Sequence, residues 1–301
     1  MHKKPNQLQI AEYILLCQSF KEWLTVLNYS GFSVPGLTNT VKDFLLFQQH
    51  NNKTALGQLM ASDASGFIKS METKTGERTG KSFSSGHINK HIQALNLFSR
   101  YIRETGRSDA GFTLTRLKEK RPKPSWLTKT EIQALYEATG DNVLGIRDRA
   151  MLALYYGCGL RLNEGASLEI KDIITEGKIL HVRKGKHYKE RLVPIAEKNF
   201  EEIVLYLQYG RPQLLQEIKT EALFIDAGKG RPLQKQSLYI RIKKLATKAK
   251  IRKKVGMHTL RHSIATHLLQ SGMKLEKIRE FLGHEGLDST QIYTHLVNEG
   301  T

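Results

Sequence analysis

The sequence predicts a mainly α-helical protein of two domains, with a small antiparallel β-sheet in the second domain. Three observations lead to this prediction. The chain has 301 residues, about twice the usual size of one domain. Apolar residues recur at helical spacing through its first hundred residues. Two short β-prone runs joined by a polar turn occur only in the second half of the chain, over residues 178–195.

The first domain is expected over residues 1–110 and should be helical. Its first helix is expected between Leu8 and Leu27, where apolar residues have the spacing of a buried helical stripe: Ile10, Ile14, Leu15, Trp23 and Leu24. Further helical patterns follow at about 38–47, 62–71 and 85–105. Ser84 or Ser85 can cap the last of these helices, because a serine side chain accepts hydrogen bonds from the first free backbone N–H groups.

A basic, proline-containing stretch separates the two domains. Residues 117–126 carry two prolines among five charges, which cannot continue a helix and bury little surface. We therefore expect a linker over residues 111–127. Thr128 and Glu131 have the spacing of a capping box, in which each side chain bonds the other residue's backbone N–H. This pair should open the second domain, residues 128–301.

The second domain is expected to combine helices with a β-hairpin. The hairpin is predicted from two β-prone runs, Ile179–Val182 and Arg191–Ile195. Helices are predicted at about 128–139, 145–157, 197–209, 237–250, 257–270 and 274–282.

The charge balance indicates a polyanionic partner. The chain carries 47 Lys and Arg against 29 Asp and Glu, a net charge of +18. Such an excess favours nucleic acid, because neutralising phosphates releases condensed counterions. Basic solubility and an anionic membrane are the alternatives. Two distant cysteines, the absence of a long apolar run and an N-terminus without an apolar signal core lead us to expect a cytoplasmic protein that does not enter membranes.

Five residues have the chemistry that attack on a DNA phosphodiester requires. Guanidinium groups suit the phosphate oxygens, a nucleophile must reach the phosphorus, and an acid must protonate the leaving oxygen. Arg161 opens a helix after a glycine-flanked bend, and His258 and Arg261 share one helix face. His284 follows 23 residues after Arg261, and Tyr293 comes nine residues later. Each motif alone is weak, but their conjunction in this order is specific.

Two simpler interpretations concern the histidines and the basic residues. His258 and His262 also have the spacing of metal ligands, but no H-E-x-x-H motif or carboxylate cluster accompanies them, so zinc is not favoured. The run from Arg241 to Lys254 is rich in basic residues. It is either a solvated helix face or a set of phosphate contacts, which fix position without reading sequence.

With these motifs the chain resembles the tyrosine recombinases, close to the Xer and the phage or integron integrase branch. The similarity covers about residues 127–296, and the N-terminal helices resemble the family's SAM-like core-binding domain more loosely. The resemblance implies that Arg161 is the first catalytic arginine and that Glu164 is the acidic residue supporting the site. It also implies that His258 and Arg261 are the family's His-x-x-Arg pair.

The resemblance assigns the remaining roles as well. His284 matches the histidine of the family's Leu-Gly-His motif, and Tyr293 matches the nucleophile that forms a 3′-phosphotyrosine link. The hairpin matches the segment that carries the family's mobile lysine, the general acid for the leaving 5′ oxygen. Counting back from Arg191 places Lys186 there. His187 stands where the family usually has a glycine, and Lys184 stays the alternative, because Lys184 and Gly185 also form a Lys-Gly pair.

The resemblance also implies an assembly and a reaction. The two domains would clamp duplex DNA, and four protomers on paired inverted-repeat core sites would exchange strands through a Holliday junction. The phosphotyrosine conserves the bond energy, so no cofactor, ATP or metal is expected. A type IB topoisomerase-like relaxing enzyme and a catalytically silent DNA-binding regulator are the alternatives. Only eight residues follow Tyr293, so we expect a monomer without DNA. The target site and biological role stay open.

Overall fold

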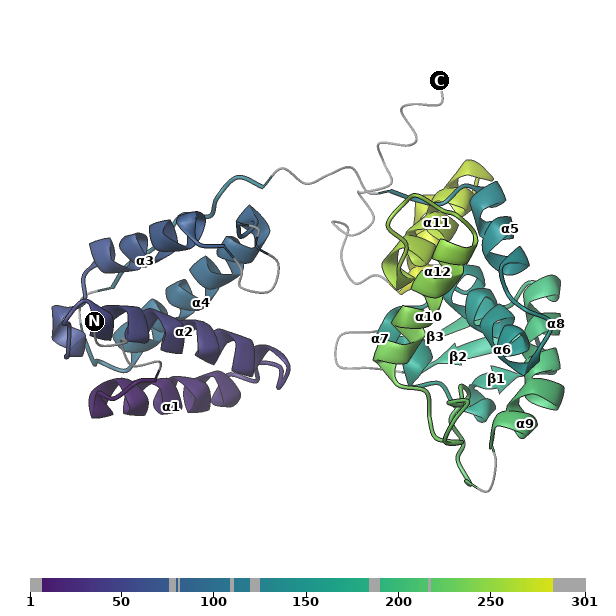
Figure 1. Cartoon of the computed structure of the whole chain (residues 1–301), viewed down its shortest axis with the longest axis horizontal. Coiled ribbons are helices and arrows are strands. Elements are labelled where there is room, and N and C mark those ends of the chain that lie inside the picture. The colour runs from purple at the N-terminus through teal and green to yellow at the C-terminus, as the bar shows by residue number, and fades with distance from the viewer. Residues whose placement is uncertain are drawn as a thin grey trace. The chain divides into compact units, whose positions relative to one another are not determined.

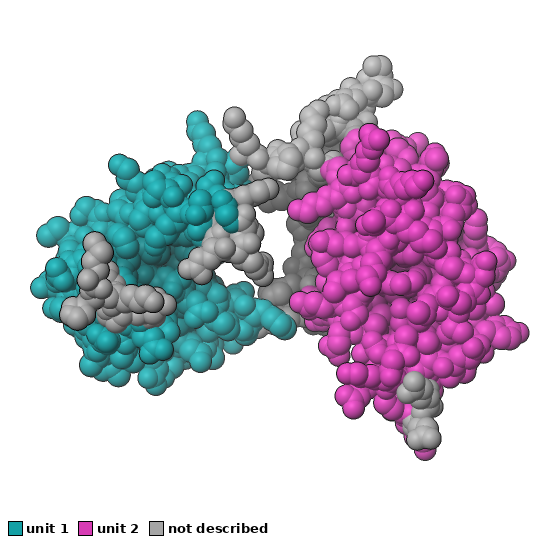
Figure 2. Space-filling model, in the orientation of Figure 1, with its two compact units in different colours: residues 1–122 teal, residues 123–301 magenta. Residues whose placement is uncertain are grey.

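A computed structural model describes residues 7–75, 80, 82–108, 111–119, 125–183, 190–215 and 218–283. The chain forms two compact units, residues 1–122 and 123–301, which Figure 2 shows in two colours. The described part is mainly helical and holds one three-stranded antiparallel sheet, in the second unit, as the sequence predicts. None of the described helices is both long and apolar enough to cross a membrane.

The described part of the first unit consists of four α-helices, which Figure 1 labels α1 to α4, and a short 3₁₀ turn. They are α1 (Ala11–Val26), α2 (Ser33–His50), η1 (Leu56–Gln58), α3 (Ala61–Thr73) and α4 (Ser85–Glu104). Helices α2 and α4 each contact the other three main helices, so these two helices form the centre of the unit. Ser84 caps α4, and its side chain accepts a hydrogen bond from the His87 backbone N–H at 3.3 Å.

The buried face of α1 differs from the predicted stripe. Ile14 is 47% exposed and Leu15 is 60% exposed, so the expectation that both are buried is wrong. The residues that α1 buries lie three or four positions apart: Tyr13, Leu16, Phe20 and Leu24. Two aromatic rings supply the larger apolar area, and Phe20 packs edge-on against Phe98 of α4 at 5.5 Å between ring centroids. These contacts set the rotation of the helix.

Residues 111–119, expected from the sequence to be part of the linker, lie along α4. Two asparagine side chains, seven residues apart on α4, form paired hydrogen bonds with the backbone of this segment, as a neighbouring β-strand would. Asn89 accepts from the Leu117 N–H at 2.8 Å and donates to its carbonyl at 3.0 Å. Asn96 does the same for Leu114, at 2.8 and 3.0 Å. The packing of the first unit therefore extends beyond residue 110.

The second unit begins with the predicted capping box. The Thr128 hydroxyl accepts from the Glu131 N–H at 3.1 Å, and the Glu131 carboxylate accepts from the Thr128 N–H at 2.7 Å. The helical elements of the unit are α5 (Lys129–Glu137), α6 (Val143–Leu152), η2 (Ala153–Gly157), α7 (Leu162–Ala166), η3 (Ile170–Asp172), α8 (Glu197–Leu205), η4 (Tyr206–Gly210), α9 (Arg211–Leu215), α10 (Lys235–Lys248), α11 (Met257–Gln270) and α12 (Leu275–Leu282).

The sheet has the strand order β1 (Ile173–Ile174), β2 (Ile179–Val182) and β3 (Arg191–Pro194). Strands β2 and β3 form the predicted hairpin, with Leu180 opposite Val193. Strand β1 was not predicted, because two residues are too few to show an alternating pattern.

Two packing contacts bring distant segments together in the second unit. Helix α11 packs against η2, and α12 packs against β3. The backbone N–H of Leu127 donates to the hydroxyl of Ser263 on α11 at 2.8 Å, which fixes the start of the unit on the same helix. As a result, residues near positions 161, 191, 261 and 283 meet in one place.

Candidate active site

Half of the predicted site residues lie within the described part of the chain. Arg161, His258 and Arg261 are described, whereas Lys186, His284 and Tyr293 lie outside the described residues.

A tight bend before α7 positions Arg161. Gly159 has a φ of +62°, and a Cβ atom built there would lie 2.7 Å from Cδ2 of Leu282. Only glycine accommodates both the left-handed backbone and this approach of α12. Arg161 follows as the residue before the first turn of α7, and its backbone N–H donates to the Glu164 carboxylate at 2.8 Å.

Three arginines from separate segments surround the buried carboxylate of Glu164. Nη1 of Arg161 donates to Oε1 at 2.8 Å. Arg191, the first residue of β3, binds both oxygens, at 3.1 Å through Nη1 and 3.0 Å through Nη2. Nη1 of Arg261 on α11 lies 3.8 Å from Oε2. A planar guanidinium matches a carboxylate in this paired fashion, so Glu164 joins three segments that are distant in sequence.

The surroundings of Glu164 keep it ionised. Burial by itself would raise its pKa, because a charge is poorly solvated away from water. The hydrogen bonds and charge of Arg191, followed by the hydrogen bonds of Arg161, outweigh burial and lower the pKa of Glu164 to about 2. The carboxylate is therefore a permanent negative charge in the centre of the cluster.

The same arginines also bind the end of α12. The last carbonyl groups of a helix have no partner within the helix, and here three consecutive ones accept from guanidinium groups. The pairs are Arg191 Nε with Phe281 O at 3.0 Å, Arg261 Nη2 with Leu282 O at 2.6 Å, and Arg161 Nη2 with Gly283 O at 3.1 Å. Arg261 also donates to Gly159 O at 2.6 Å. The cluster thus fixes the residue that directly precedes His284.

The structure brings Arg161 and Arg261 together on Glu164, and it adds a residue that sequence reasoning missed. The sequence motif gives Arg191 no role of its own, only a fixed spacing to Lys186. Its charge was the available signal: a basic residue opens an otherwise apolar strand, and its side chain is only 7% exposed. Charged side chains are rarely buried without a partner, so an arginine that begins an apolar strand predicts a buried carboxylate beside it.

His258 occupies a different environment from the arginines. It is exposed in the first turn of α11, one turn before the buried Arg261. Within the described part of the chain it forms no hydrogen bond or ion pair with the arginine cluster. Two neighbouring histidines have packing roles: His262 lies edge-on to Trp126, and His267 is hydrogen-bonded to the Tyr156 hydroxyl at 2.8 Å.

The comparisons with known proteins decide the family. The sequence matches the model of the phage integrase family over residues 125–299. This chain belongs to the phage integrase family. It is 38% identical to the tyrosine recombinase XerD of Staphylococcus aureus over 216 residues, which cover 71% of this chain and 72% of that protein.

Two solved structures of family members share the fold. One is the site-specific recombinase XerH, with a TM-score of 0.71 at 20% identity, covering 98% of this chain and 88% of that one. The other is the integrase of the Tn1549 transposon, with a TM-score of 0.72 at 19% identity, covering 93% and 95%. The assignment to the tyrosine recombinases made from the sequence is confirmed. The chain is accordingly an enzyme of site-specific recombination, which breaks and rejoins DNA.

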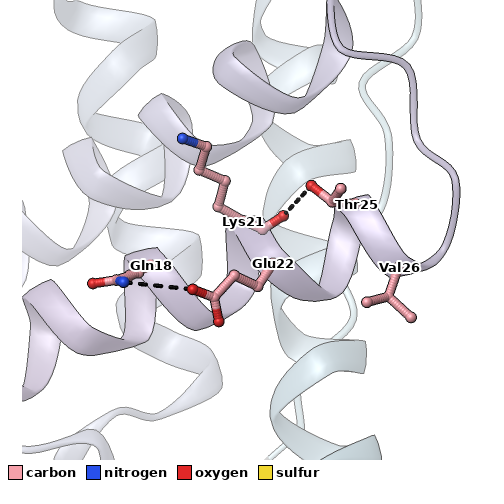
Figure 3. A pocket seen from close by; sticks show the side chains of 5 residues that line it. All are labelled: Gln18, Lys21, Glu22, Thr25 and Val26. Carbon is pink, nitrogen blue, oxygen red and sulfur yellow. Dashed lines mark hydrogen bonds between the residues drawn. The ribbon is translucent and has the colours of Figure 1, made fainter.

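A pocket on α1 lies in the first unit, whereas the Glu164 cluster lies in the second unit. Figure 3 shows that its lining comes from one helix: Gln18, Lys21, Glu22, Thr25 and Val26. The polar groups there form hydrogen bonds with one another, Gln18 to Glu22 at 3.4 Å and Thr25 to the Lys21 carbonyl at 2.9 Å.

Among the described residues no group of three or more His, Cys, Asp or Glu is placed to hold a metal ion.

Proposed function

We propose that this recombinase cleaves duplex DNA with Tyr293, forms a 3′-phosphotyrosine intermediate and exchanges strands between two sites through a Holliday junction. The observation that carries the proposal is the convergence of Arg161 and Arg261. The two residues are a hundred positions apart, yet both contact the same buried carboxylate. Two guanidinium groups held together in this way suit the non-bridging oxygens of one phosphate.

The proposed cleavage step uses the residues as follows. The phenolic oxygen of Tyr293 bonds to phosphorus, and the bond from phosphorus to the 5′ oxygen breaks. Lys186 gives a proton to that leaving oxygen, while the exposed His258 is the candidate acceptor for the phenolic proton. Arg161, Arg261 and His284 stabilise the charge on the phosphate. The ester to tyrosine conserves the bond energy, so rejoining needs no ATP or metal.

Duplex DNA is the proposed partner. The net charge of +18 supports a footprint of several phosphates, with the basic run of residues 241–254 as the candidate contact. The related XerH structure is described as bound to a palindromic substrate, and the transposon integrase as a complex with transposon end DNA. We propose that the two units clamp DNA and that protomers are monomeric until they assemble, as tetramers, on paired inverted-repeat core sites in the cytoplasm.

The decisive experiment traps the covalent intermediate. A suicide substrate, nicked beside the cleavage position mapped on native DNA, should give a protein–DNA adduct on denaturing gels. Tyr293→Phe should abolish the adduct and leave affinity nearly unchanged, because the basic contacts that bind DNA stay intact. Adduct formed by Tyr293→Phe would show that another residue is the nucleophile. Binding without any adduct from the wild type would support the silent regulator instead.

A second experiment separates Lys186 from Lys184. A 5′-phosphorothiolate leaving group needs no proton, so it should restore cleavage by Lys186→Ala and leave Lys184→Ala unaffected. Equal defects without restoration would show that neither lysine is the acid. The topoisomerase-like alternative is not favoured, because the curated relative is a tyrosine recombinase. Relaxation of supercoiled DNA by a single protomer without strand exchange would reinstate it.

A further inference from the structure

The arginine cluster contains a charge conflict. A phosphodiester carries one negative charge, and more negative charge develops on its oxygens as the nucleophile attacks. Arg161 and Arg261 supply two positive charges, but Glu164 lies within 4 Å of both guanidinium groups. Its pKa of about 2 keeps it ionised at neutral pH. Taken alone, these three residues would offer the phosphate only one net positive charge.

Arg191 is placed to remove this conflict. It binds both oxygens of Glu164, and its third donor, Nε, is fixed on the carbonyl of Phe281. The side chain is 7% exposed, so its charge is little screened by water. With Arg191 included, three guanidinium groups lie within 4 Å of the Glu164 carboxylate, and together the four groups carry two net positive charges.

We propose that Arg191 is a positioning residue that neutralises Glu164, so that the positive charge of Arg161 and Arg261 stays directed at the scissile phosphate. Glu164 aligns the two arginines, and Arg191 cancels the electrostatic cost of placing a carboxylate beside a phosphate site. Arg191 also opens β3, five positions after Lys186 in the sequence. This inference rests on the proposed function, since it assumes phosphate binding at Arg161 and Arg261.

The competing interpretation is that Arg191 only holds the fold together. The two interpretations differ in how they depend on charge. A structural role is independent of the charge of the substrate. If Arg191 balances charge, its loss should slow cleavage less when the scissile phosphate is replaced by a neutral group. Its loss should also slow cleavage less when Glu164 is replaced by a neutral residue.

The test measures single-turnover cleavage of the suicide substrate at saturating DNA. Arg191→Gln should slow cleavage about 100-fold, the scale seen when one charge-stabilising group is removed, with DNA affinity nearly unchanged. Adding Glu164→Gln should raise the cleavage rate of Arg191→Gln at least about tenfold, because the double variant again has two net positive charges at the site. A methylphosphonate at the scissile position, which replaces a charged oxygen by a neutral methyl group, should shrink the defect of Arg191→Gln to below about tenfold.

Arg149→Gln is the matched control. Arg149 also binds a carboxylate, Glu202 at 2.9 Å, and a backbone carbonyl, Gly140 O at 3.0 Å, but it lies outside the Glu164 cluster. Its loss should change the melting temperature and not the cleavage rate of the folded protein. If Arg191→Gln does not fold, the double variant decides, because it removes the buried carboxylate together with the arginine that binds both of its oxygens, and only Arg161 and Arg261 then lack their counter-charge.

The outcomes separate the two proposals. Wild-type protein that gives no adduct refutes the proposed function, whatever Arg191 does. The charge-balance role alone is overturned by a different result, in which the wild type forms the adduct. In that result, Arg191→Gln slows cleavage equally on phosphate and on methylphosphonate, and the double variant recovers none of the lost rate. A folded double variant that cleaves about 100-fold more slowly than wild type also overturns it.

Discussion

Two of the buried carboxylates in the second unit, Glu164 and Asp148, have arginine neighbours whose effects on the carboxylate pKa are opposite in outcome. Glu164 accepts four hydrogen bonds, spread over both oxygens, from Arg161 and Arg191. Asp148 is fully buried, but Arg241 reaches only its Oδ2, and Oδ1 has no hydrogen bond, with Arg147 at 3.8 Å. The pKa of Glu164 is lowered to about 2. Burial raises the pKa of Asp148 despite both arginines.

The difference shows that nearby positive charge does not by itself stabilise a buried carboxylate. Desolvation costs a buried ion several kcal/mol, and attraction offsets it only when hydrogen bonds occupy the lone pairs. Glu164 meets this condition, so it can serve as a fixed anchor for the catalytic arginines. Asp148 does not, and its ion pair joins α6 to α10 away from the Glu164 cluster.

The largest expected effect is on stability. Glu164→Gln should lower the free energy of unfolding by about 3–5 kcal/mol at neutral pH, because it leaves buried arginines without their counter-charge. Asp148→Asn should change it by less than about 1 kcal/mol, since the folded protein disfavours the ionised form. Urea unfolding at pH 7 measures both. Equal losses would show that hydrogen-bond coverage does not distinguish the two sites.

The second expected effect is on cleavage. Arg161→Gln should slow single-turnover cleavage by about 10²–10³-fold, because it removes a guanidinium from the proposed phosphate site. Arg147→Gln removes an arginine beside Asp148 and should leave the cleavage rate of the folded protein near wild type. The covalent adduct, quantified against time, measures both rates. A comparable loss in Arg147→Gln would extend the functional site to the Asp148 region.

The sequence predicted the features that depend on neighbouring residues. The Thr128–Glu131 capping box, the Ser84 cap and the β2–β3 hairpin are set by residues close together in the chain. The failures concern contacts between distant residues. The exposed position of Ile14 follows from the rings against which α1 packs, and periodicity alone does not identify them.

The candidate site divides in the same way. Arg161 and Arg261 were found because motif and resemblance identify residues by local spacing. The role of Arg191 depends on carboxylate and carbonyl groups 27 and 90 residues away, and no local pattern encodes such a meeting. The pairing of Asn89 and Asn96 with residues 114 and 117 was missed for the same reason. Lys186, His284 and Tyr293 stay predictions, since they lie outside the described residues.

The third expected effect is a difference in acid sensitivity. The pKa of Glu164 falls from an ordinary 4.5 to about 2 on folding, so the unfolded chain binds more protons between these values. Its contribution is complete above pH 4.5 and is lost as pH falls to about 2, in total roughly 3 kcal/mol. Glu164→Gln should therefore flatten the acid limb of a stability-against-pH curve.

The contribution of Asp148 to stability should change with pH in the opposite direction. Its raised pKa means that the folded protein binds more protons just above the ordinary value of 3.8, so its contribution weakens as pH rises. Asp148→Asn should remove that loss and make the rise in stability with pH steeper. Parallel curves for both variants would contradict the opposite pKa shifts.

The smallest expected effect concerns the glycine that ends α12 against the Glu164 cluster. Gly283 has a φ of +65°, and a Cβ there would lie 2.9 Å from Nη1 and 3.0 Å from Cδ of Arg191. Gly106 has a φ of +62° with open space around it, so Gly106→Ala isolates the backbone cost, about 1–2 kcal/mol. Gly283→Ala should cost about 1 kcal/mol more, because three hydrogen bonds prevent Arg191 from moving aside. It should also slow cleavage, which Gly106→Ala should not. Equal unfolding free energies and equal cleavage rates for the two variants would show that the Arg191 side chain moves aside readily. Glu164 would then not hold the arginines as a fixed anchor.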